Sequence, residues 1–334
     1  MANHRPEITV MTAVWNGTAS LAETIACIQA QTFTDWEYII VDDASTDGTP
    51  ALVEEAMQKD SRIRLLRRTT SEGPYIAAND GLREAKGKWV VRIDADDLSP
   101  SNRIERQRDF LLANPHYRAC VSYWQGFNYR GLFPNSITPI PRTPGVFRWY
   151  LMLRTPSIHS ALCVERSAME EIGGYGKARL SQDYRLWCEL SRRGWLGTIP
   201  EVLSYVRNHP DRASYTTRGI QQELALDVLS DHIVAMTGER WSRVELEALW
   251  CVGHCKVMPV DKGLKMLDRW DRMWRKASDL TAEDRAELER LSAYRRWKHI
   301  RTNARKNPAE AILQILRFGL TRPSAIIPSA QSSY

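Results

Sequence analysis

Apolar and polar positions along the first hundred residues follow a pattern typical of strands joined by helices. Short apolar runs of strand length are separated by longer segments in which apolar residues recur at helical spacing. The pattern predicts strands and helices in turn at residues 8–14, 20–31, 37–41, 48–60, 63–67, 74–85 and 89–93. Because strand and helix alternate with short connections, we expect a largely parallel sheet with helices on both faces.

The pattern changes beyond residue 100. Residues 120–155 are irregular, aromatic and interrupted by prolines, which predicts a loop-rich region. Strand-like runs return at 161–164 and 203–207, with a helix-like segment at 183–193 between them. From about residue 217 to residue 318, helical periodicity and charged residues dominate, so a helical region is expected to follow the sheet.

Composition places the chain among globular proteins, with 334 residues, 43% hydrophobic and 26% charged. No charged-then-apolar leader opens the sequence, and no run approaches the roughly 18 to 20 apolar residues that cross a bilayer, so a cytoplasmic protein is expected. The six cysteines are dispersed, which favours reduced thiols. Cys251, His254 and Cys255 lack a second ligand pair nearby, and a buried helical face is favoured there over zinc.

The net charge of +6 belongs mostly to the C-terminal region, where 20 Lys and Arg stand against 15 Asp and Glu from Tyr215 onward. Such an excess fits an anionic membrane surface, an acidic polymer or solvated helices. Residues 309–318, flanked by arginines, suit an interfacial helix at the inner face of a membrane. Packing of that helix on its own domain or on a partner subunit is an equal alternative. Basic residues alternate with acidic ones and no nucleic-acid module is present, so nucleic acid is not expected as a partner.

Three carboxylates crowd the end of the apolar run at residues 89–93. Asp94, Asp96 and Asp97 repel one another at the rim of the expected sheet, and a hard divalent metal carrying a phosphate-bearing ligand would compensate their charge. An acidic turn that caps the next helix is the alternative. In open α/β sheets, ligands bind outside the carboxyl ends of the strands. No G-x-G-x-x-G turn or P-loop follows a strand, so nucleotide binding would have to use carboxylates and a metal.

Four motifs occur in order along the chain: VDDASTDGT, GPYIAANDGLREAKGKWVVRIDADD, GGYGKARLSQDYRLWCEL and YVRNHPDRAS. With them, residues 8–214 resemble the family 2 glycosyltransferases of the GT-A fold. The resemblance implies an α/β fold with a Rossmann-like, mostly parallel central sheet flanked by helices, followed here by a helical C-terminal extension. It also implies transfer of a sugar from a nucleotide sugar to an acceptor hydroxyl, with inversion and a divalent metal, Mn²⁺ or Mg²⁺.

The resemblance gives a domain plan. Residues 1–214 would form the GT-A domain, with 1–100 as the donor-binding half and 101–214 as the acceptor and catalytic half. Residues 215–320 would form the basic helical region, and 321–334 a loose tail.

For the nucleotide, the resemblance implies that Asp43 reads the base edge, since a carboxylate can accept a ring N–H. Thr12, Ala13 and Trp15 would line the base pocket, with Trp15 stacking on the base. Without the family resemblance, the local sequence predicts that Asp43 is a turn or helix-cap residue and that Trp15 is a core aromatic. Asp47 is expected only to form an Asx-turn or to cap the helix that follows it.

For the diphosphate, the resemblance implies that Asp94 and Asp96 bind the ribose and the metal. His209 would close over the diphosphate and can join the metal's ligands, although a loop histidine is often merely exposed. Asp97 either assists or caps the following helix.

For the chemistry, Asp183 matches the family's catalytic base, which takes the proton of the acceptor hydroxyl. An Asp at a helix start is also stabilising for local reasons. Two positions depart from the family pattern: Gln182 stands where an acid usually precedes the base, and Ala78 stands where many relatives carry an Arg near the diphosphate. Arg92 or Arg207 could supply that charge.

The sequence therefore predicts a metal-dependent inverting glycosyltransferase, with UDP favoured as the nucleotide, that acts on a glycan or lipid-linked acceptor in surface-polysaccharide or glycoconjugate synthesis. The alternative is a non-catalytic nucleotide-sugar-binding or assembly subunit with the same fold. The sugar, the acceptor and the oligomeric state, including a homo-oligomer, are left open.

Overall fold

The computed structural model describes residues 5–128, 131–133, 140–176, 181–209 and 218–304. The chain divides into two compact units. One contains the described residues up to Arg142 together with Ser157–Gln221, and the other contains Thr143–Pro156 with the described residues from Gln222 onward. The expected half 1–100 lies within the first unit, whereas the expected half 101–214 includes Thr143–Pro156 of the second unit. The functional roles of the two halves stay predictions.

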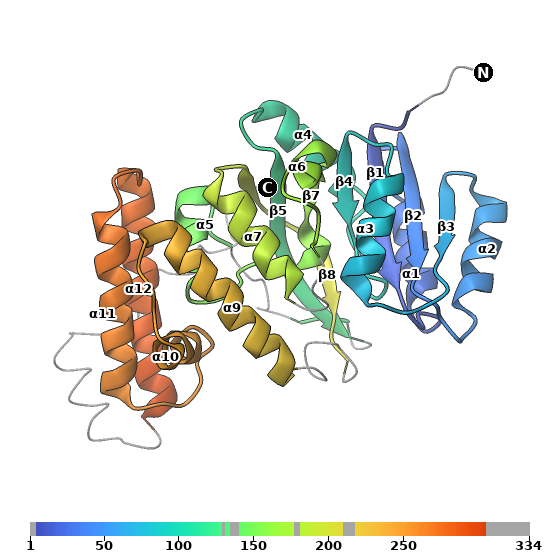
Figure 1. Ribbon diagram of the computed structural model, residues 1–334. Coiled ribbons are helices and arrows are strands. Elements are labelled where there is room, and N and C mark those ends of the chain that lie inside the picture. Colours follow the sequence, from blue (N-terminus) through green and yellow to red (C-terminus); the bar gives the residue numbers. More distant parts are fainter. Residues whose placement is uncertain (1–4, 129–130, 134–139, 177–180, 210–217, 305–334) are drawn as a thin grey trace. The chain divides into compact units, whose positions relative to one another are not determined.

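An eight-stranded mixed sheet forms the centre of the first unit (Figure 1). The strands run in the order β3-β2-β1-β4-β7-β5-β6, and β8 also pairs with β5. β1 to β4 pair in parallel, whereas β7 is antiparallel to β4 and β5. The expected α/β fold with a mostly parallel sheet is thus confirmed. The strands are β1 (Ile8–Val14), β2 (Trp36–Asp42), β3 (Ile63–Arg67), β4 (Trp89–Arg92), β5 (Ala119–Asn128), β6 (Gly131–Leu132), β7 (Cys163–Glu165) and β8 (Leu196–Arg207).

Helices cover both faces of the β1–β4 part of this sheet. Val10 and Val14 of β1 belong to an apolar cluster with Ile25 of α1 (Leu21–Gln29). Met11 points to the opposite face, where α3 (Pro74–Glu84) packs so closely that a Cβ on Gly81 would lie 2.7 Å from the Met11 sulfur. Because successive strand residues face opposite sides, a strand covered on both faces reads as one continuous apolar run. The other helical segments of this unit are α2 (Thr49–Lys59), α4 (Arg103–Ala113), η1 (His159–Ala161), α6 (Arg166–Glu171) and α7 (Gln182–Arg192).

The carboxyl ends of β1, β2 and β4 meet at one edge of the sheet because these strands are parallel. The connections that leave this edge are joined to one another: the Asp43 N–H donates to the Val14 carbonyl at 2.8 Å, and the Gly17 N–H donates to the Thr49 hydroxyl at 2.8 Å. Asp47 accepts from the Thr49 N–H at 3.0 Å, which is the Asx-turn expected as one of its two local roles; the N-cap residue of α2 is Gly48.

The prediction of a loop-rich region over residues 120–155 was wrong in two places. β5 occupies Ala119–Asn128 and pairs in parallel with β8 along its length. α5 occupies Pro144–Tyr150 and starts at its proline, while the Thr143 hydroxyl caps it by accepting from the Val146 N–H at 3.2 Å. A proline is tolerated at the first helical position, because its missing N–H would have no partner there.

The second unit is helical, as the sequence predicts, and α5 is part of it. The indole N–H of Trp270 donates to the Trp149 carbonyl at 2.9 Å, and His232 Nε2 lies 2.7 Å from the Arg148 carbonyl. The expected interfacial segment 309–318 lies outside the described residues. The remaining helices are α9 (Arg218–Thr237), α10 (Arg243–Gly253), α11 (Val260–Lys276) and α12 (Ala282–Asn303).

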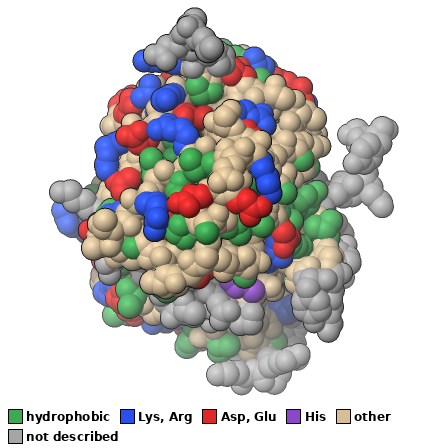
Figure 2. Space-filling view, turned by 90° about the vertical axis from the view of Figure 1, so that its right-hand side faces the viewer, with side chains coloured by type: hydrophobic (Ala, Val, Ile, Leu, Met, Phe, Trp, Pro, Cys, Tyr) green, Lys and Arg blue, Asp and Glu red, His purple; other side chains and the backbone are tan. Residues whose placement is uncertain are grey.

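Charges of both signs are interspersed on the face of the molecule where β3 and α2 lie in Figure 1, as Figure 2 shows. The described residues of that face form no area of a single sign, so the basic excess is not gathered there. None of the described helices is both long and apolar enough to cross a membrane.

Gly87, in the turn before β4, tests how tightly the neighbouring central strands β1 and β4 are fixed. A Cβ at this position would lie 2.4 Å from the Thr9 backbone nitrogen, so Gly87→Ala must displace β1 or β4. We expect a loss of about 1–3 kcal/mol in the free energy of unfolding, measured by urea denaturation. The matched control is Gly219→Ala in α9, where the added Cβ meets open space and Ala favours the helix. Equal stability of the Gly87 variant and the wild type would contradict this packing.

Candidate active site

Asp94 follows β4 and is held at both its backbone and its side chain. Its N–H donates to the Ser160 hydroxyl at 3.0 Å, and its Oδ1 lies 3.1 Å from Nη2 of Arg92. The carboxylate is 42% exposed although Arg92 is buried. Asp94 therefore presents a partly open carboxylate at the sheet edge, fixed from beneath by a buried cation.

Asp96 and His209, which are far apart in the sequence, lie side by side. Nε2 of His209 is 2.8 Å from Oδ2 of Asp96, and both side chains are about one-third exposed, at 34% and 31%. Arg207, at the end of β8, helps to bring them together because its Nε–H donates to the Asp96 carbonyl at 2.9 Å. The structure thus joins the late loop to the acidic turn.

The acidic turn and His209 carry the ligand types that a hard divalent ion takes. Mg²⁺ and Mn²⁺ prefer carboxylate oxygen, and Mg²⁺ is usually held by one or two carboxylates plus substrate phosphate oxygens. Asp94 and Asp96 supply two partly exposed carboxylates and His209 an imidazole. Among the described residues, no group of three or more His, Cys, Asp and Glu is placed so that it could hold a metal ion, neither Asp94, Asp96 and His209 nor Cys251, His254 and Cys255. A metal at the acidic turn therefore stays a prediction.

Asp97 does not cap a helix, because α4 begins at Arg103 and its N-cap residue is Asn102. Instead its buried carboxyl group accepts from the Ser160 hydroxyl at 2.5 Å and from the Arg207 N–H at 3.0 Å. Burial raises the pKa of Asp97 to about 8, and the charges of its two acidic neighbours add to the effect. Asp97 therefore joins the η1 turn and β8 to the acidic turn.

Asp43 lies at the end of β2, buried among donors. Its two carboxylate oxygens accept from the Ser71 hydroxyl at 2.7 Å, the Gly73 N–H at 2.9 Å, Nη1 of Arg68 at 3.2 Å and the Glu72 N–H at 3.3 Å. A carboxylate has about four acceptor positions, so these donors occupy all of them. Asp43 fixes the connection between β3 and α3, and its role in reading a base stays a prediction.

The other residues expected at the base pocket differ in exposure. Thr12 is buried, with its hydroxyl donating to the Ile93 carbonyl at 2.8 Å and bonded to the Tyr38 hydroxyl. Ala13 is 9% exposed, whereas Trp15 is 60% exposed. Trp15 therefore has a free ring surface on which a base could stack, which rules out the core reading of this residue.

Asp183 is the second residue of α7 and is half-buried. Burial raises the pKa of Asp183 above its ordinary value, and the negative charge of Asp94 adds to this increase. Hydrogen bonds from the Tyr184 N–H and from Tyr75 act in the opposite direction, and the pKa stays raised. A raised pKa makes a carboxylate a stronger proton acceptor, which suits a general base. Gln182, one of the two residues that depart from the family pattern, is buried, and its side-chain oxygen accepts from Nε of Arg185 at 3.3 Å.

Arg92 and Arg207 are the candidates to supply the positive charge that many relatives place at the position of Ala78. Both guanidinium groups are already engaged by other residues. Ala78 is buried in α3. Arg92 is 2% exposed, and its Nη1 donates to the carbonyls of Met11 and Ile93 at 2.9 and 3.2 Å. Arg207 pairs through Nη2 with Glu23 at 2.8 Å.

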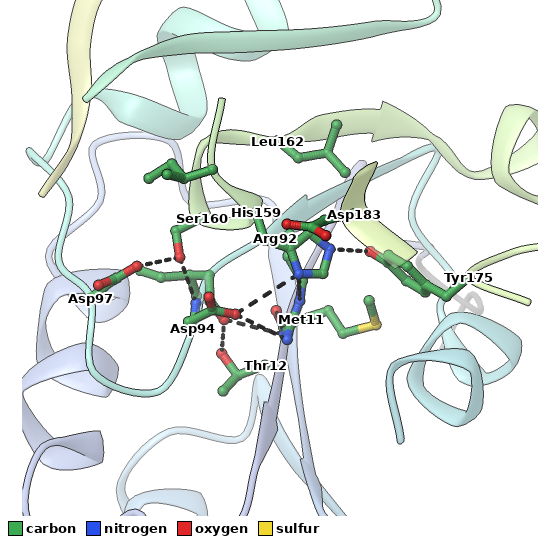
Figure 3. A network of polar contacts seen from close by, with 12 residues as sticks. Met11, Thr12, Arg92, Asp94, Asp97, His159, Ser160, Leu162, Tyr175 and Asp183 are labelled. Atoms are coloured by element: carbon green, nitrogen blue, oxygen red, sulfur yellow. Dashed lines mark hydrogen bonds and ion pairs between the residues drawn. The ribbon is translucent and has the colours of Figure 1, made fainter. Parts of the chain in front are cut away.

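Two residues of the site carry no signal in the sequence. His159 Nδ1 accepts from Nε of Arg92 at 3.4 Å, and its Nε2 lies 2.9 Å from the Tyr175 hydroxyl (Figure 3). Burial, aided by the Arg92 charge, lowers the pKa of His159 to about 3, so its ring is neutral. A single His and a single Tyr, 16 residues apart in irregular segments, form no pattern that periodicity or spacing could detect.

Comparison with known proteins identifies relatives of this chain. The family model described as Glycosyl transferase family 2 matches residues 9–173. EpsE of Bacillus subtilis (strain 168), provisionally named a glycosyltransferase, is 32% identical over 222 residues, which are 64% of this chain and 78% of that protein. The Escherichia coli UDP-Gal:alpha-D-GlcNAc-diphosphoundecaprenol beta-1,3-galactosyltransferase is 26% identical over 210 residues, which are 62% of this chain and 76% of that protein.

Solved structures share the fold. TarS 1-349 of S. aureus in complex with UDP-GlcNAc superposes with a TM-score of 0.59 at 16% identity, over 95% of this chain and 93% of that one. The mannosyltransferase PcManGT from Pyrobaculum calidifontis, in complex with GDP-Man and Mn2+, superposes with a TM-score of 0.53 at 21% identity. The match covers 96% of this chain and 82% of that one. The expected GT-A architecture with a helical C-terminal region is thus confirmed.

The Asp97 carboxyl group predicts a pH-dependent stability. Between its ordinary pKa of 3.8 and the raised value of about 8, the folded state holds a proton that the unfolded state releases. The free energy of unfolding therefore falls as pH rises through this range, by up to about 1.4 kcal/mol per pH unit. Asp97→Asn cannot titrate, so its stability relative to the wild type should rise from pH 5 to pH 8, measured by urea denaturation with chelator present.

The control for this comparison is Asp109→Asn on the exposed side of α4, whose stability relative to the wild type should change much less over the same range. A stability difference for Asp97→Asn that stays constant between pH 5 and pH 8 would contradict the buried, protonated state of Asp97.

Proposed function

The chain belongs to glycosyl transferase family 2, and from this premise we propose that it is a metal-dependent inverting enzyme that moves a sugar from a nucleoside diphosphate sugar to an acceptor hydroxyl. The observation that carries the proposal is the meeting of Asp94, Asp96 and His209 at the carboxyl edge of the sheet, with the half-buried base candidate Asp183 close enough to Asp94 for their charges to interact. The first three would hold the diphosphate end of the donor, and Asp183 would act on the acceptor.

The proposed reaction is one displacement at the anomeric carbon. The acceptor oxygen forms a bond to that carbon while the bond from the carbon to the diphosphate oxygen breaks, and the electron pair leaves with the nucleoside diphosphate. Asp183 takes the proton of the acceptor hydroxyl. A divalent ion held by Asp94, Asp96 and His209 would neutralise the charge that builds on the departing diphosphate. Attack from the face opposite the leaving group inverts the configuration.

UDP is the proposed nucleotide. The Escherichia coli relative is named for a UDP-Gal donor, and the exposed ring of Trp15 at the end of β1 supplies a stacking surface that any base can use. The name of that relative also includes a diphosphoundecaprenol acceptor, which supports a lipid-linked or glycan acceptor in surface-polysaccharide synthesis for this chain. The basic C-terminal region would then contact an anionic membrane surface where such acceptors lie.

The catalytic base is tested by Asp183→Asn. The amide cannot take the acceptor proton, so transfer should fall by a factor of about 100 or more while UDP affinity, measured by calorimetry, stays within about threefold. Asp109→Asn, on the exposed side of α4, is the matched control and should retain transfer. Transfer that persists in the Asp183 variant would remove this residue from the role of base. A wild type that binds UDP with metal but transfers no sugar to any acceptor would favour the non-catalytic subunit.

The donor site is tested by metal removal and by Asp96→Ala. We expect EDTA to abolish UDP binding and Mn²⁺ to restore it, because two carboxylates beside a diphosphate repel it without a cation. Asp96→Ala should weaken metal-dependent UDP binding at least tenfold, and His209→Asn less, since the imidazole is a supporting ligand. Glu105→Ala, an exposed acid at the start of α4, serves as the control. UDP binding that is equal with and without metal would contradict the proposed donor site.

A further inference from the structure

Arg92 is anchored at the sheet edge and cannot follow a ligand. Its Nη1 donates to the carbonyls of Met11 and Ile93 at 2.9 and 3.2 Å; Met11 lies in the middle of β1, and Ile93 directly follows β4. The side chain is 2% exposed. A buried guanidinium needs a counter-charge, and among the described residues the acid within 4.0 Å of it is Asp94.

Asp94 is in turn fixed by two contacts. Oδ1 pairs with Nη2 of Arg92 at 3.1 Å, and the backbone N–H donates to the Ser160 hydroxyl at 3.0 Å. Ser160 lies next to His159 in η1, so the same turn supports the backbone and the side chain of Asp94. Figure 3 shows these contacts converging on Asp94.

The direction of each hydrogen bond in this network follows from the donors available. Arg92 Nε–H can only donate, so Nδ1 of His159 must accept at 3.4 Å and carries no proton. The ring is neutral and its proton sits on Nε2, which donates to the Tyr175 hydroxyl at 2.9 Å. One tautomer of His159 therefore satisfies both neighbours.

The far end of the network is held by α3. The Tyr175 N–H donates to Oδ1 of Asn79 at 2.9 Å, and Nδ2 of Asn79 donates to the Gly176 carbonyl at 2.9 Å. A Cβ on Gly174, whose φ is +63°, would come within 2.6 Å of the same Asn79 oxygen. Asn79 thus clamps the turn that carries Tyr175, and an unbroken series of contacts runs from α3 to the Asp94 carboxylate.

We propose that Arg92 and His159 are positioning residues for the donor site: His159, as its Nε2–H tautomer, fixes the orientation of Arg92, and Arg92 fixes the Asp94 carboxylate toward the nucleoside diphosphate and its metal. The inference rests on the proposed function. Residues that orient a metal-binding carboxylate through hydrogen bonds commonly change metal-dependent affinity 10- to 100-fold when replaced.

Two substitutions of His159 separate its two hydrogen bonds. Asn places a carbonyl oxygen where Nδ1 lies and can still accept from Arg92, whereas Gln places its amide where Nε2 lies and loses that contact. We expect His159→Gln to raise the dissociation constant of UDP with Mn²⁺ about tenfold or more. His159→Asn and Tyr175→Phe should raise it less than about threefold. Replacing buried Arg92 puts folding at risk, so the test compares the two variants His159→Gln and His159→Asn.

His116→Gln, at an exposed histidine of the same unit, is the control for the substitution itself. Thermal unfolding of each variant shows whether the fold is retained. If His159→Gln and His159→Asn keep the wild-type melting temperature and weaken UDP binding equally, or leave it unchanged, the positioning role is wrong.

A second measurement does not depend on UDP binding. In ¹⁵N-labelled protein at neutral pH, the imidazole signals that disappear in His159→Asn should be those of a neutral ring with the proton on Nε2. An Nδ1–H tautomer or a charged ring would overturn the inference. Absence of UDP binding in the wild type would count against the proposed function alone, and the tautomer would still decide the network.

Discussion

Three carboxylates within four residues at the end of β4 impose the constraint on which the rest of the site depends. Each is compensated by a different means: Asp94 by the buried guanidinium of Arg92, Asp96 by its contact with the imidazole of His209, and Asp97 by the proton that its raised pKa retains. Without these partners the repulsion and desolvation of the three groups would oppose folding of the turn. The groups that contact the three carboxylates come from β4, from η1 and from the end of β8, so the acidic turn organises the second half of its unit.

The same compensation leaves the turn competent to bind. Asp97 uses both oxygens to hold the Ser160 hydroxyl and the Arg207 N–H, and it therefore serves the fold. Asp94 and Asp96 remain about one-third to two-fifths exposed, at 42% and 31%, each with its partner on one side. Under the proposed function, a cation and a diphosphate would approach two carboxylates that are already oriented, and less ordering would remain to be done when the donor binds.

Sequence patterns predicted the β1–β4 sheet because β1, β2 and β4 read as largely apolar runs with polar residues at the carboxyl end, and the edge strand β3 is a short apolar run interrupted by Arg64. They failed for β5 and α5, since Pro144 was taken as a breaker although it starts a helix and β5 depends on pairing with β8 about 80 residues away. The Arg92–His159–Tyr175 contacts were invisible for the same reason: they exist only after β4, η1 and the turn before α7 have been brought together.

Asp43 shows how a residue can match a motif and still be occupied by its own fold. Its four acceptor positions are filled by the connection between β3 and α3, so a base edge that donates to it has to replace one of these donors. Arg68 is the donor whose departure would cost least, because it also pairs with Glu72 and, through Nε, with Asp80 at 3.1 Å. The charge of Arg68 would stay compensated after the exchange. Reading of the base by Asp43 would therefore be coupled to the position of Arg68 and of the connection that carries it.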